Sequence, residues 1–135
     1  MIFQKRHLRL PIIISKADKV TFVKSNMFEN IDGTFNLIVS NPPYIPTKDI
    51  FELEHEVKNE EPMLALDGHD DGLFFYRILA EESAKYLRHN GGVFMEIGYN
   101  QAEDVRNLLI KNNFTDISVI KDLAGLDRVV CGWRK

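Results

Sequence analysis

Hydrophobic and polar positions follow two different patterns along the chain, and each pattern predicts a different kind of element. Residues 35–40 form a nearly continuous apolar run, which is typical of a strand buried on both faces of a parallel sheet. Residues 92–97 favour a second buried strand of this kind. Residues 19–24 alternate between apolar and polar side chains and are rich in β-formers, which favours a further strand.

Residues 72–89 carry apolar side chains at helical spacing, so we expect a helix there. Asp70 or Asp71 can cap the start of this helix, and the glycine pair after Asn90 supplies a left-handed stop. Its expected buried stripe consists of Tyr76, Leu79, Ala80, Ser83, Ala84 and Leu87.

A second helix is expected at 100–112, with Asn100 as its N-cap and Glu103 at the capping-box position. Two final strands are expected at 117–121 and 128–133. The order strand, helix, strand, helix, strand predicts an α/β sheet with right-handed crossovers. We expect this sheet to be mostly parallel, with an antiparallel last strand.

Ligands of such sheets bind at the carboxyl ends of the strands, and two conspicuous positions fall there. Asn41 follows the first apolar run, and Gly98 follows the second. Residues 41–70 have no clear period, and a loop of about thirty residues in a compact domain is usually functional or disordered. We therefore expect the functional site at this edge.

The composition is that of a soluble globular domain, with 44% hydrophobic and 27% charged residues in a chain of 135. The net charge of −3 argues against a general nucleic-acid binder, which would usually carry a basic field. No apolar run approaches the ~20 residues that a membrane span needs. The single cysteine, Cys131, excludes an internal disulfide and agrees with a reducing, cytoplasmic setting.

The tetrapeptide Asn41-Pro42-Pro43-Tyr44 carries the candidate chemistry. Amide and aromatic amine nitrogens are poor nucleophiles, because their lone pair is delocalised. Two hydrogen-bond acceptors aimed at the NH₂ group can hold it in line with a methyl donor and favour the localised lone pair. The side-chain carbonyl of Asn41 and the backbone carbonyl of Pro42 can do this, and Tyr44 offers a flat face for stacking. The pattern therefore favours an N-methyltransferase, although a strand that simply ends in a proline turn is the alternative.

Other polar groups have simpler interpretations. The four histidines, His7, His55, His69 and His89, lack the spacing of metal ligands, so we expect no metal site. The acidic run of Glu52, Glu54, Glu56, Glu60 and Glu61 is interpreted as a solvated loop.

From residue 19 to its end, the chain resembles the C-terminal half of the release-factor glutamine methyltransferase (HemK) family. The tetrapeptide alone is shared with adenine-N6 and guanine-N2 methyltransferases, but the full set of matching stretches is more specific. These stretches are Phe35 to Pro46, Glu61-Pro62 with Ala65 to Gly68, Asp71 to Leu73 with Tyr76-Arg77, Glu96 to Gly98 with Gln101, Asp122 to Gly125, and Asp127 to Val130.

The resemblance implies S-adenosylmethionine as methyl donor and a release-factor glutamine as acceptor. It implies that Asn41, Pro42, Pro43 and Tyr44 hold the glutamine amide, and that Asn41 also lies next to the donor. The Met27 side chain is implied to pack near the donor's adenine. The family usually has Asp where this chain has Asn26 in the same segment.

The departure from the family is large. None of the eight glycines forms the family's glycine-rich loop, and residues 1–18 match nothing in it clearly. The expected fold is therefore a partial Rossmann-like class I methyltransferase sheet without its first strands. In the family's sheet the last strand lies between the two preceding it, and the strand at 35–40 would lose its outer neighbours.

Two consequences are expected for the chain by itself. Residues 19–135 would form the C-terminal half of the catalytic domain and be inactive alone, since the donor site is incomplete. The bare edge at 35–40 invites pairing into a homo-oligomer. The alternatives are a nucleic-acid N-methyltransferase that uses the same tetrapeptide, and a non-catalytic remnant that only associates.

Overall fold

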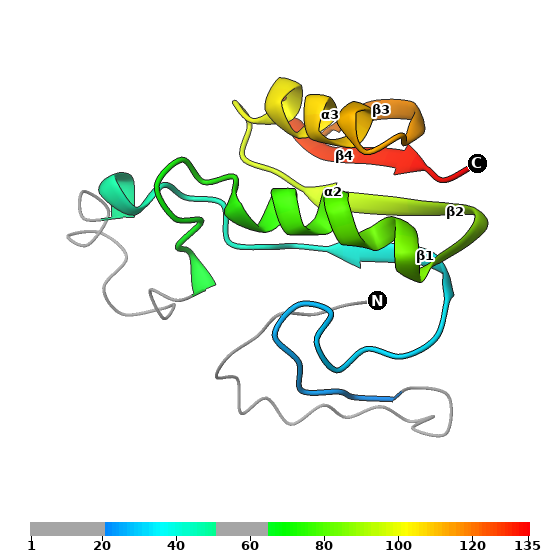
Figure 1. Ribbon diagram of the computed structural model, residues 1–135. Coiled ribbons are helices and arrows are strands. Elements are labelled where there is room, and N and C mark those ends of the chain that lie inside the picture. The colour runs from blue at the N-terminus through cyan, green and yellow to red at the C-terminus, as the bar shows by residue number, and fades with distance from the viewer. Residues whose placement is uncertain (1–20, 51–64) are drawn as a thin grey trace.

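The computed structural model describes residues 21–50 and 65–135, and these include one sheet, two helices of ten residues or more, and a helical turn at residues 47–50 (Figure 1). Both expected helices are present, and the strands expected at 35–40, 92–97, 117–121 and 128–133 are confirmed. The elements are β1 (Phe35–Ser40), α2 (Phe74–Tyr86), β2 (Leu87–Glu96), α3 (Ala102–Lys111), β3 (Thr115–Lys121) and β4 (Asp127–Trp133).

The sheet has four strands in the order β1-β2-β4-β3, so the last strand lies between the two that precede it. β1 and β2 are parallel, and Ile38 lies opposite Val93 in their register. β4 runs antiparallel to both β2 and β3. The predicted strand order and the antiparallel last strand are therefore confirmed.

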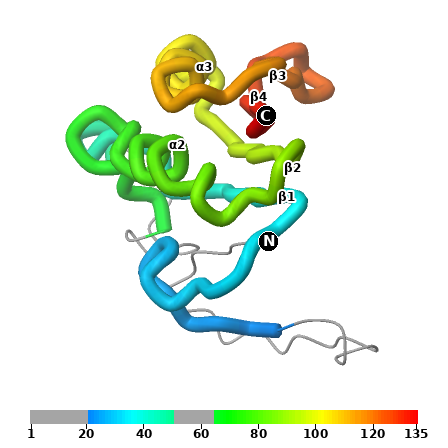
Figure 2. Tube along the Cα trace, turned by 45° about the vertical axis from the view of Figure 1, so that its right-hand side comes forward, coloured from blue at the N-terminus to red at the C-terminus, as the bar shows by residue number. Residues whose placement is uncertain are grey.

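Both helices cover the same face of the sheet, as Figure 2 shows. Alternate residues of the strands point into this layer, and Ile38, Val93, Met95 and Val130 are 1% exposed or less. They belong to one core cluster with residues of both helices, Tyr76, Leu79, Ala80, Val105 and Leu109. Burying aliphatic and aromatic side chains stabilises a fold by ~1.5–3 kcal/mol each, so this cluster is the main source of stability.

The opposite face of β1 is open to solvent. Leu37 and Val39, which alternate with the buried Ile38, are 45% and 46% exposed. β1 also lies at the edge of the sheet. The predicted edge position of residues 35–40 is confirmed, and an apolar edge strand of this kind can pair with another chain.

The strand expected at 19–24 is a wrong prediction over the residues that the structure describes. Residues 21–24 are exposed and are not in a strand, with Phe22 65% exposed. A strand needs a partner for its backbone groups. In the described part of the chain β1 has β2 as its only strand neighbour, and residues 21–24 do not pair with its free edge. Lys19 and Val20 lie outside the described residues, as do residues 1–18.

The first helix is shorter than its periodicity indicated. It ends at Tyr86, and residues 87–89, expected to finish the helix, begin β2 instead. The backbone N–H of Asn90 donates to the Arg134 carbonyl (2.8 Å), and that of Arg134 donates to the Gly91 carbonyl (2.8 Å). Asn90 does have a positive φ of 62°, but inside the strand rather than as a helix stop. Pairing with the chain beyond β4 has outweighed the local helical pattern.

The predicted helix caps are also wrong. Leu73 and Gln101 hold the N-cap positions of α2 and α3, and neither makes a side-chain capping hydrogen bond. Asp71 instead accepts from the Leu73 N–H (3.0 Å) and forms an ion pair with Arg77, which holds the pKa of the Asp71 carboxyl below its usual value. Glu103 forms an ion pair with Arg106 at 3.8 Å rather than a capping box.

Candidate functional site

The tetrapeptide that follows β1 lies at the carboxyl end of the strand, as the sequence predicted. Asn41 is exposed, Pro42 and Pro43 are buried, and Tyr44 is half-buried. Proline fixes its own φ near −65°, so two buried prolines in a row make the connection between Asn41 and Tyr44 stiff. The exposed Asn41 side chain is therefore attached to a stiff, buried segment.

A second segment of the chain packs directly against the backbone of this proline segment. The Ile45 N–H donates to the Leu66 carbonyl (3.0 Å), and the Gly68 N–H donates to the Ile45 carbonyl (2.8 Å). A Cβ placed on Gly68 would lie 2.9 Å from the Tyr44 Cα, closer than real atoms come. Gly68 is thus needed for the two backbones to approach each other.

Asp67 ties the same two segments together through its side chain. Its Oδ1 accepts from the Thr47 hydroxyl (2.8 Å) and from the His69 N–H (2.9 Å). The Thr47 N–H in turn donates to the His69 carbonyl (3.1 Å). The chain from Tyr44 to Thr47 is therefore fixed along its length.

Gln101 joins the tetrapeptide to both β2 and α2. Its Nε2 donates to the Tyr44 carbonyl (3.0 Å) and to the Gly72 carbonyl (3.3 Å), and its Oε1 accepts from the Gly98 N–H (3.0 Å). The residue is only 7% exposed. Sequence reasoning included Gln101 among the matching positions but gave it no role. Its signal was a long amide side chain just after the end of a buried strand.

Tyr76 fixes the end of β2 from the helix side. The residue is fully buried, and its hydroxyl donates to the Glu96 carbonyl (2.8 Å). Burial raises the pKa of the Tyr76 hydroxyl, so it remains a neutral donor at physiological pH. The sequence predicted Tyr76 only as part of a buried stripe.

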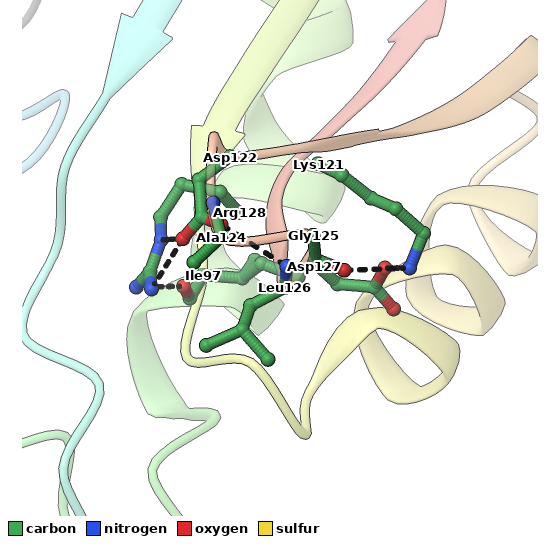
Figure 3. A network of polar contacts seen from close by, with 8 residues as sticks. All are labelled: Ile97, Lys121, Asp122, Ala124, Gly125, Leu126, Asp127 and Arg128. Atoms are coloured by element: carbon green, nitrogen blue, oxygen red, sulfur yellow. Dashed lines mark hydrogen bonds and ion pairs between the residues drawn. The ribbon is translucent and has the colours of Figure 1, made fainter.

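The hairpin between β3 and β4 closes the same edge of the sheet (Figure 3). Asp122 Oδ1 accepts from the Ala124 and Leu126 N–H groups, at 2.9 and 3.0 Å. Arg128 donates to Asp122 Oδ2 at 3.0 and 3.2 Å and to the Ile97 carbonyl at 3.4 Å. The Leu126 N–H, and then the Arg128 guanidinium, lower the pKa of the Asp122 carboxyl.

The structure places Met27 in the core. It is 7% exposed in a turn, with a positive φ of 50°, and it belongs to the main core cluster. The next residue, Phe28, stacks on Tyr86 with ring centroids 4.7 Å apart. Asn26 donates to the Glu29 carboxylate (2.8 Å), so its side chain already has a partner. Contact of Met27 with a methyl donor stays a prediction.

Histidines and carboxylates give no further candidate in the described residues. No group of three or more His, Cys, Asp or Glu side chains that could hold a metal ion occurs in residues 21–50 and 65–135. His69 lies against the Phe74 ring, 4.3 Å between centroids. His7, His55 and the acidic run from Glu52 to Glu61 lie outside the described part. Among the helices that the structure describes, none has the length and apolar character to cross a membrane.

Comparison with known proteins explains this arrangement. No protein-family model matches the chain. The chain is 46% identical over 120 residues to the release factor glutamine methyltransferase of Fusobacterium nucleatum subsp. nucleatum, covering 87% of this chain and 34% of that protein. It is 42% identical over 118 residues to the protein of the same name from Thermodesulfovibrio yellowstonii, covering 87% and 42%. The chain is related to the release factor glutamine methyltransferase family.

The chain therefore spans only about a third to two fifths of the length of these methyltransferases. A solved methyltransferase structure from Pyrococcus furiosus superposes with a TM-score of 0.53 at 19% identity, over 77% of this chain and 43% of that one. This likeness concerns the fold alone. The chain has a partial Rossmann-like class I methyltransferase sheet, as its sequence predicted.

Proposed function

We propose that this chain forms the acceptor-binding part of an S-adenosylmethionine-dependent enzyme that methylates the N5 nitrogen of a release-factor glutamine. The single observation that carries the proposal is the exposed Asn41 at the carboxyl end of β1, followed directly by the buried Pro42 and Pro43. The names of the two relatives, both release factor glutamine methyltransferases, support the reaction and the substrate. Residues 19–135 would correspond to the C-terminal half of the catalytic domain.

The acceptor chemistry follows from the groups of this segment. The Asn41 side-chain carbonyl and the Pro42 backbone carbonyl accept the two N–H bonds of the glutamine amide, and Tyr44 stacks on its plane. Both acceptors favour the state in which the nitrogen lone pair is localised and can attack. The amide nitrogen would form a bond to the methyl carbon as the donor's methyl–sulfur bond breaks and the sulfur leaves as a thioether. The nitrogen would then lose one proton to solvent, so no general base is needed.

The donor supplies an electrophilic methyl group when bound, but this chain offers only part of a donor site. Asn41 is exposed and available, whereas Met27 is 7% exposed and packed in the core. The sequence contains no glycine-rich loop of the kind that holds the donor's amino-acid part. The donor-binding roles of Met27 and Asn41 are therefore proposed only for a protein in which this chain is combined with the remainder of such a site, as in the chimera below.

The proposal is tested with a chimera in which this chain replaces the matching part of the Fusobacterium nucleatum relative. We expect the purified chimera, with S-adenosylmethionine, to add one methyl group to the acceptor glutamine of a release factor, detected by peptide mass spectrometry. A release factor with Asn in place of that glutamine is the control and should remain unmodified. A folded chimera that binds the donor and leaves the glutamine unmodified would reject the proposal.

The same assay covers the alternative substrate. A nucleic-acid methyltransferase would use the same four residues, but neither the net charge of −3 nor the relatives favour it. DNA and RNA offered to the chimera should stay unmethylated.

We also propose that the isolated chain associates with itself through β1. The strand lies at the edge of the sheet, and Leu37 and Val39 expose apolar surface beside that edge. Removing such surface from water is favourable by ~25 cal/mol per Å².

The buried, unpaired Cys131 agrees with a reducing setting such as the cytoplasm.

A further inference from the structure

Gln101 is a buried polar residue whose side-chain amide forms hydrogen bonds with backbone groups outside its own helix. It occupies the N-cap position of α3 but does not cap the helix. Its amide instead bonds to three backbone groups outside the helix, on Tyr44, Gly72 and Gly98. Tyr44 and Gly72 lie near the two ends of the connection between β1 and α2, and Gly98 lies in the connection between β2 and α3, so the bonds join two connections at the carboxyl edge of the sheet. Two of the bonds span 57 and 29 residues of sequence.

The space around this amide is closed. A Cβ placed on Gly72 would lie 2.7 Å from Gln101 Nε2 and would also collide with the Tyr44 carbonyl oxygen. Gly72 has a φ of +74°, a conformation that favours glycine. The close packing and the three hydrogen bonds therefore restrict the orientation of the amide against the Tyr44 carbonyl.

The bond to Tyr44 acts on the proposed acceptor site through a stiff path. The peptide groups that carry the Pro42 and Tyr44 carbonyls are separated by the φ and ψ angles of Pro43 and of Tyr44. The ring of Pro43 fixes its φ, and the burial of Pro43 and the close packing of the Tyr44 backbone against Gly68 restrict the other angles. Gly68 and the Ile45–Leu66 hydrogen bond hold the other side of the same segment. Gln101 is the only side chain among the described residues that bonds directly to the Tyr44 carbonyl.

We propose that Gln101 is a positioning residue for the acceptor amide: it sets the direction of the Pro42 carbonyl through the Tyr44 carbonyl. The inference rests on the proposed function, since it assigns a role within the same site. Gln101 itself does not touch the substrate. A purely structural role, in which Gln101 only stabilises the start of α3, is the competing explanation.

Two variants separate these explanations. Gln101→Glu keeps an oxygen that can accept from the Gly98 N–H but loses the Nε2 donor, and so breaks the bonds to Tyr44 and Gly72. Val105 lies one turn further along α3 and is fully buried, so Val105→Ala removes core packing without deleting any of the Gln101 side-chain hydrogen bonds. The free energy of unfolding of both variants is measured with urea over a range of temperatures, at a pH where Glu is ionised. The variants are then compared at temperatures at which these free energies are equal.

The first measurement is backbone hydrogen exchange in the full 135-residue chain. We expect the Ile45 and Gly68 N–H groups to exchange at least tenfold faster in Gln101→Glu than in Val105→Ala at matched stability. Equal exchange in the two variants would show that the loss of the Gln101 bonds acts only through global stability, and the inference would be overturned.

The second measurement is the affinity for a release-factor peptide that contains the acceptor glutamine. It is obtained by NMR titration of the wild-type chain and both variants. We expect Gln101→Glu to weaken binding at least tenfold and Val105→Ala to change it less than twofold. If the wild-type chain binds the glutamine peptide and the Gln101→Glu variant binds it equally well, the inference is rejected and the proposed function stands. A wild-type chain that binds the glutamine peptide no better than the same peptide with Asn rejects the proposed function, and the inference falls with it.

Discussion

At the scale of single residues, the site combines one exposed polar side chain with a buried, inflexible support. Asn41 is accessible to a substrate, whereas the prolines that follow are buried and Tyr44 is half-buried. A hydrogen-bond acceptor is most useful to a reaction when it does not have to reorganise as the reaction proceeds. The burial pattern of these four residues provides that property.

The first prediction concerns Asn41 itself, in the chimera described above. Asn41→Ala removes one of the two acceptors that hold the amide nitrogen, so we expect methyl transfer to slow by ~10²-fold or more, by analogy with the loss of one oxyanion-hole donor. Donor binding should suffer less, because other groups of the full-length protein also hold the donor. Single-turnover assays and donor titration of the same samples measure the two effects. Near-normal turnover would reject the role given to Asn41.

At the scale of elements, backbone contacts between distant loops fix the acceptor segment. Gly68 allows the segment before α2 to lie against Tyr44, and Ile45 pairs with Asp67 in an isolated parallel bridge. The hairpin between β3 and β4 is stabilised separately, by the carboxylate of Asp122. Each of these arrangements can be tested by one substitution.

The second prediction is that Gly68→Ala loosens the acceptor segment. Its Cβ would lie 2.8–2.9 Å from the backbone of Gly72 and Tyr44, and neither backbone can move without breaking the bonds around it. Overpacking of this kind typically costs ~1–3 kcal/mol. Urea unfolding should show that loss of stability. Gly68 does not have a positive φ, so backbone strain should add nothing; an unchanged urea midpoint would mean that the two segments are not in close contact.

The third prediction concerns pH and the β3–β4 hairpin. The pKa of the Asp122 carboxyl is lowered in the folded protein, so its contribution to stability is fully present above its ordinary value of 3.8 and is lost as the pH falls through the lowered value. Asp122→Asn should therefore destabilise the chain at pH 7 and make little difference at a pH below the lowered value. Urea unfolding at both pH values measures the difference. A variant that loses equal stability at both would show that the charge of Asp122 does not matter.

At the scale of the whole molecule, two features matter: how much of its relatives the chain matches, and the edge of its sheet. It covers 34% and 42% of two relatives, and its sheet has an edge at β1 with apolar side chains beside it. We proposed above that this chain supplies only part of the binding site for the methyl donor. Both facts bear on how the isolated chain behaves in solution.

The fourth prediction is that the isolated chain binds S-adenosylmethionine too weakly to methylate anything. Halving a micromolar binding free energy of about −8 kcal/mol leaves about −4 kcal/mol, which corresponds to a Kd near millimolar. Isothermal calorimetry on the purified chain measures the affinity. A micromolar Kd would show that residues outside the described ranges supply a substitute for the missing part of the donor site.

The fifth prediction is that the chain self-associates and that a charge on β1 prevents it. Val39→Lys places a charge on the open face of the edge strand, which is a common way in which proteins protect such edges. Sedimentation velocity should show oligomers of the wild-type chain and a monomer for the variant. Lys24→Ala, on an exposed residue away from the sheet, is the control and should behave like the wild-type chain. A wild-type chain that is monomeric at all concentrations would exclude association through β1.

The sequence by itself determined the type and order of the elements and the place of the tetrapeptide. The apolar run at β1 and the helical stripe of α3 are local patterns, and each has one stable way to bury its apolar face. Proline must end a strand, so Asn41 had to lie at the carboxyl end of β1. The motifs also determined the family resemblance, which comparison with known proteins confirmed.

Only the tertiary structure decided which polar groups meet. The local pattern at 19–24 favoured a strand, but the described residues 21–24 have no strand partner. Residues 87–89 were predicted to be helical and lie in β2 instead. Gln101 was predicted to lie just inside a helix, and the structure uses it to hold Tyr44, 57 residues away in sequence. Strand pairing and buried hydrogen bonds join residues that are distant along the chain. Periodicity reports only what a segment can bury, and not which partner it will find.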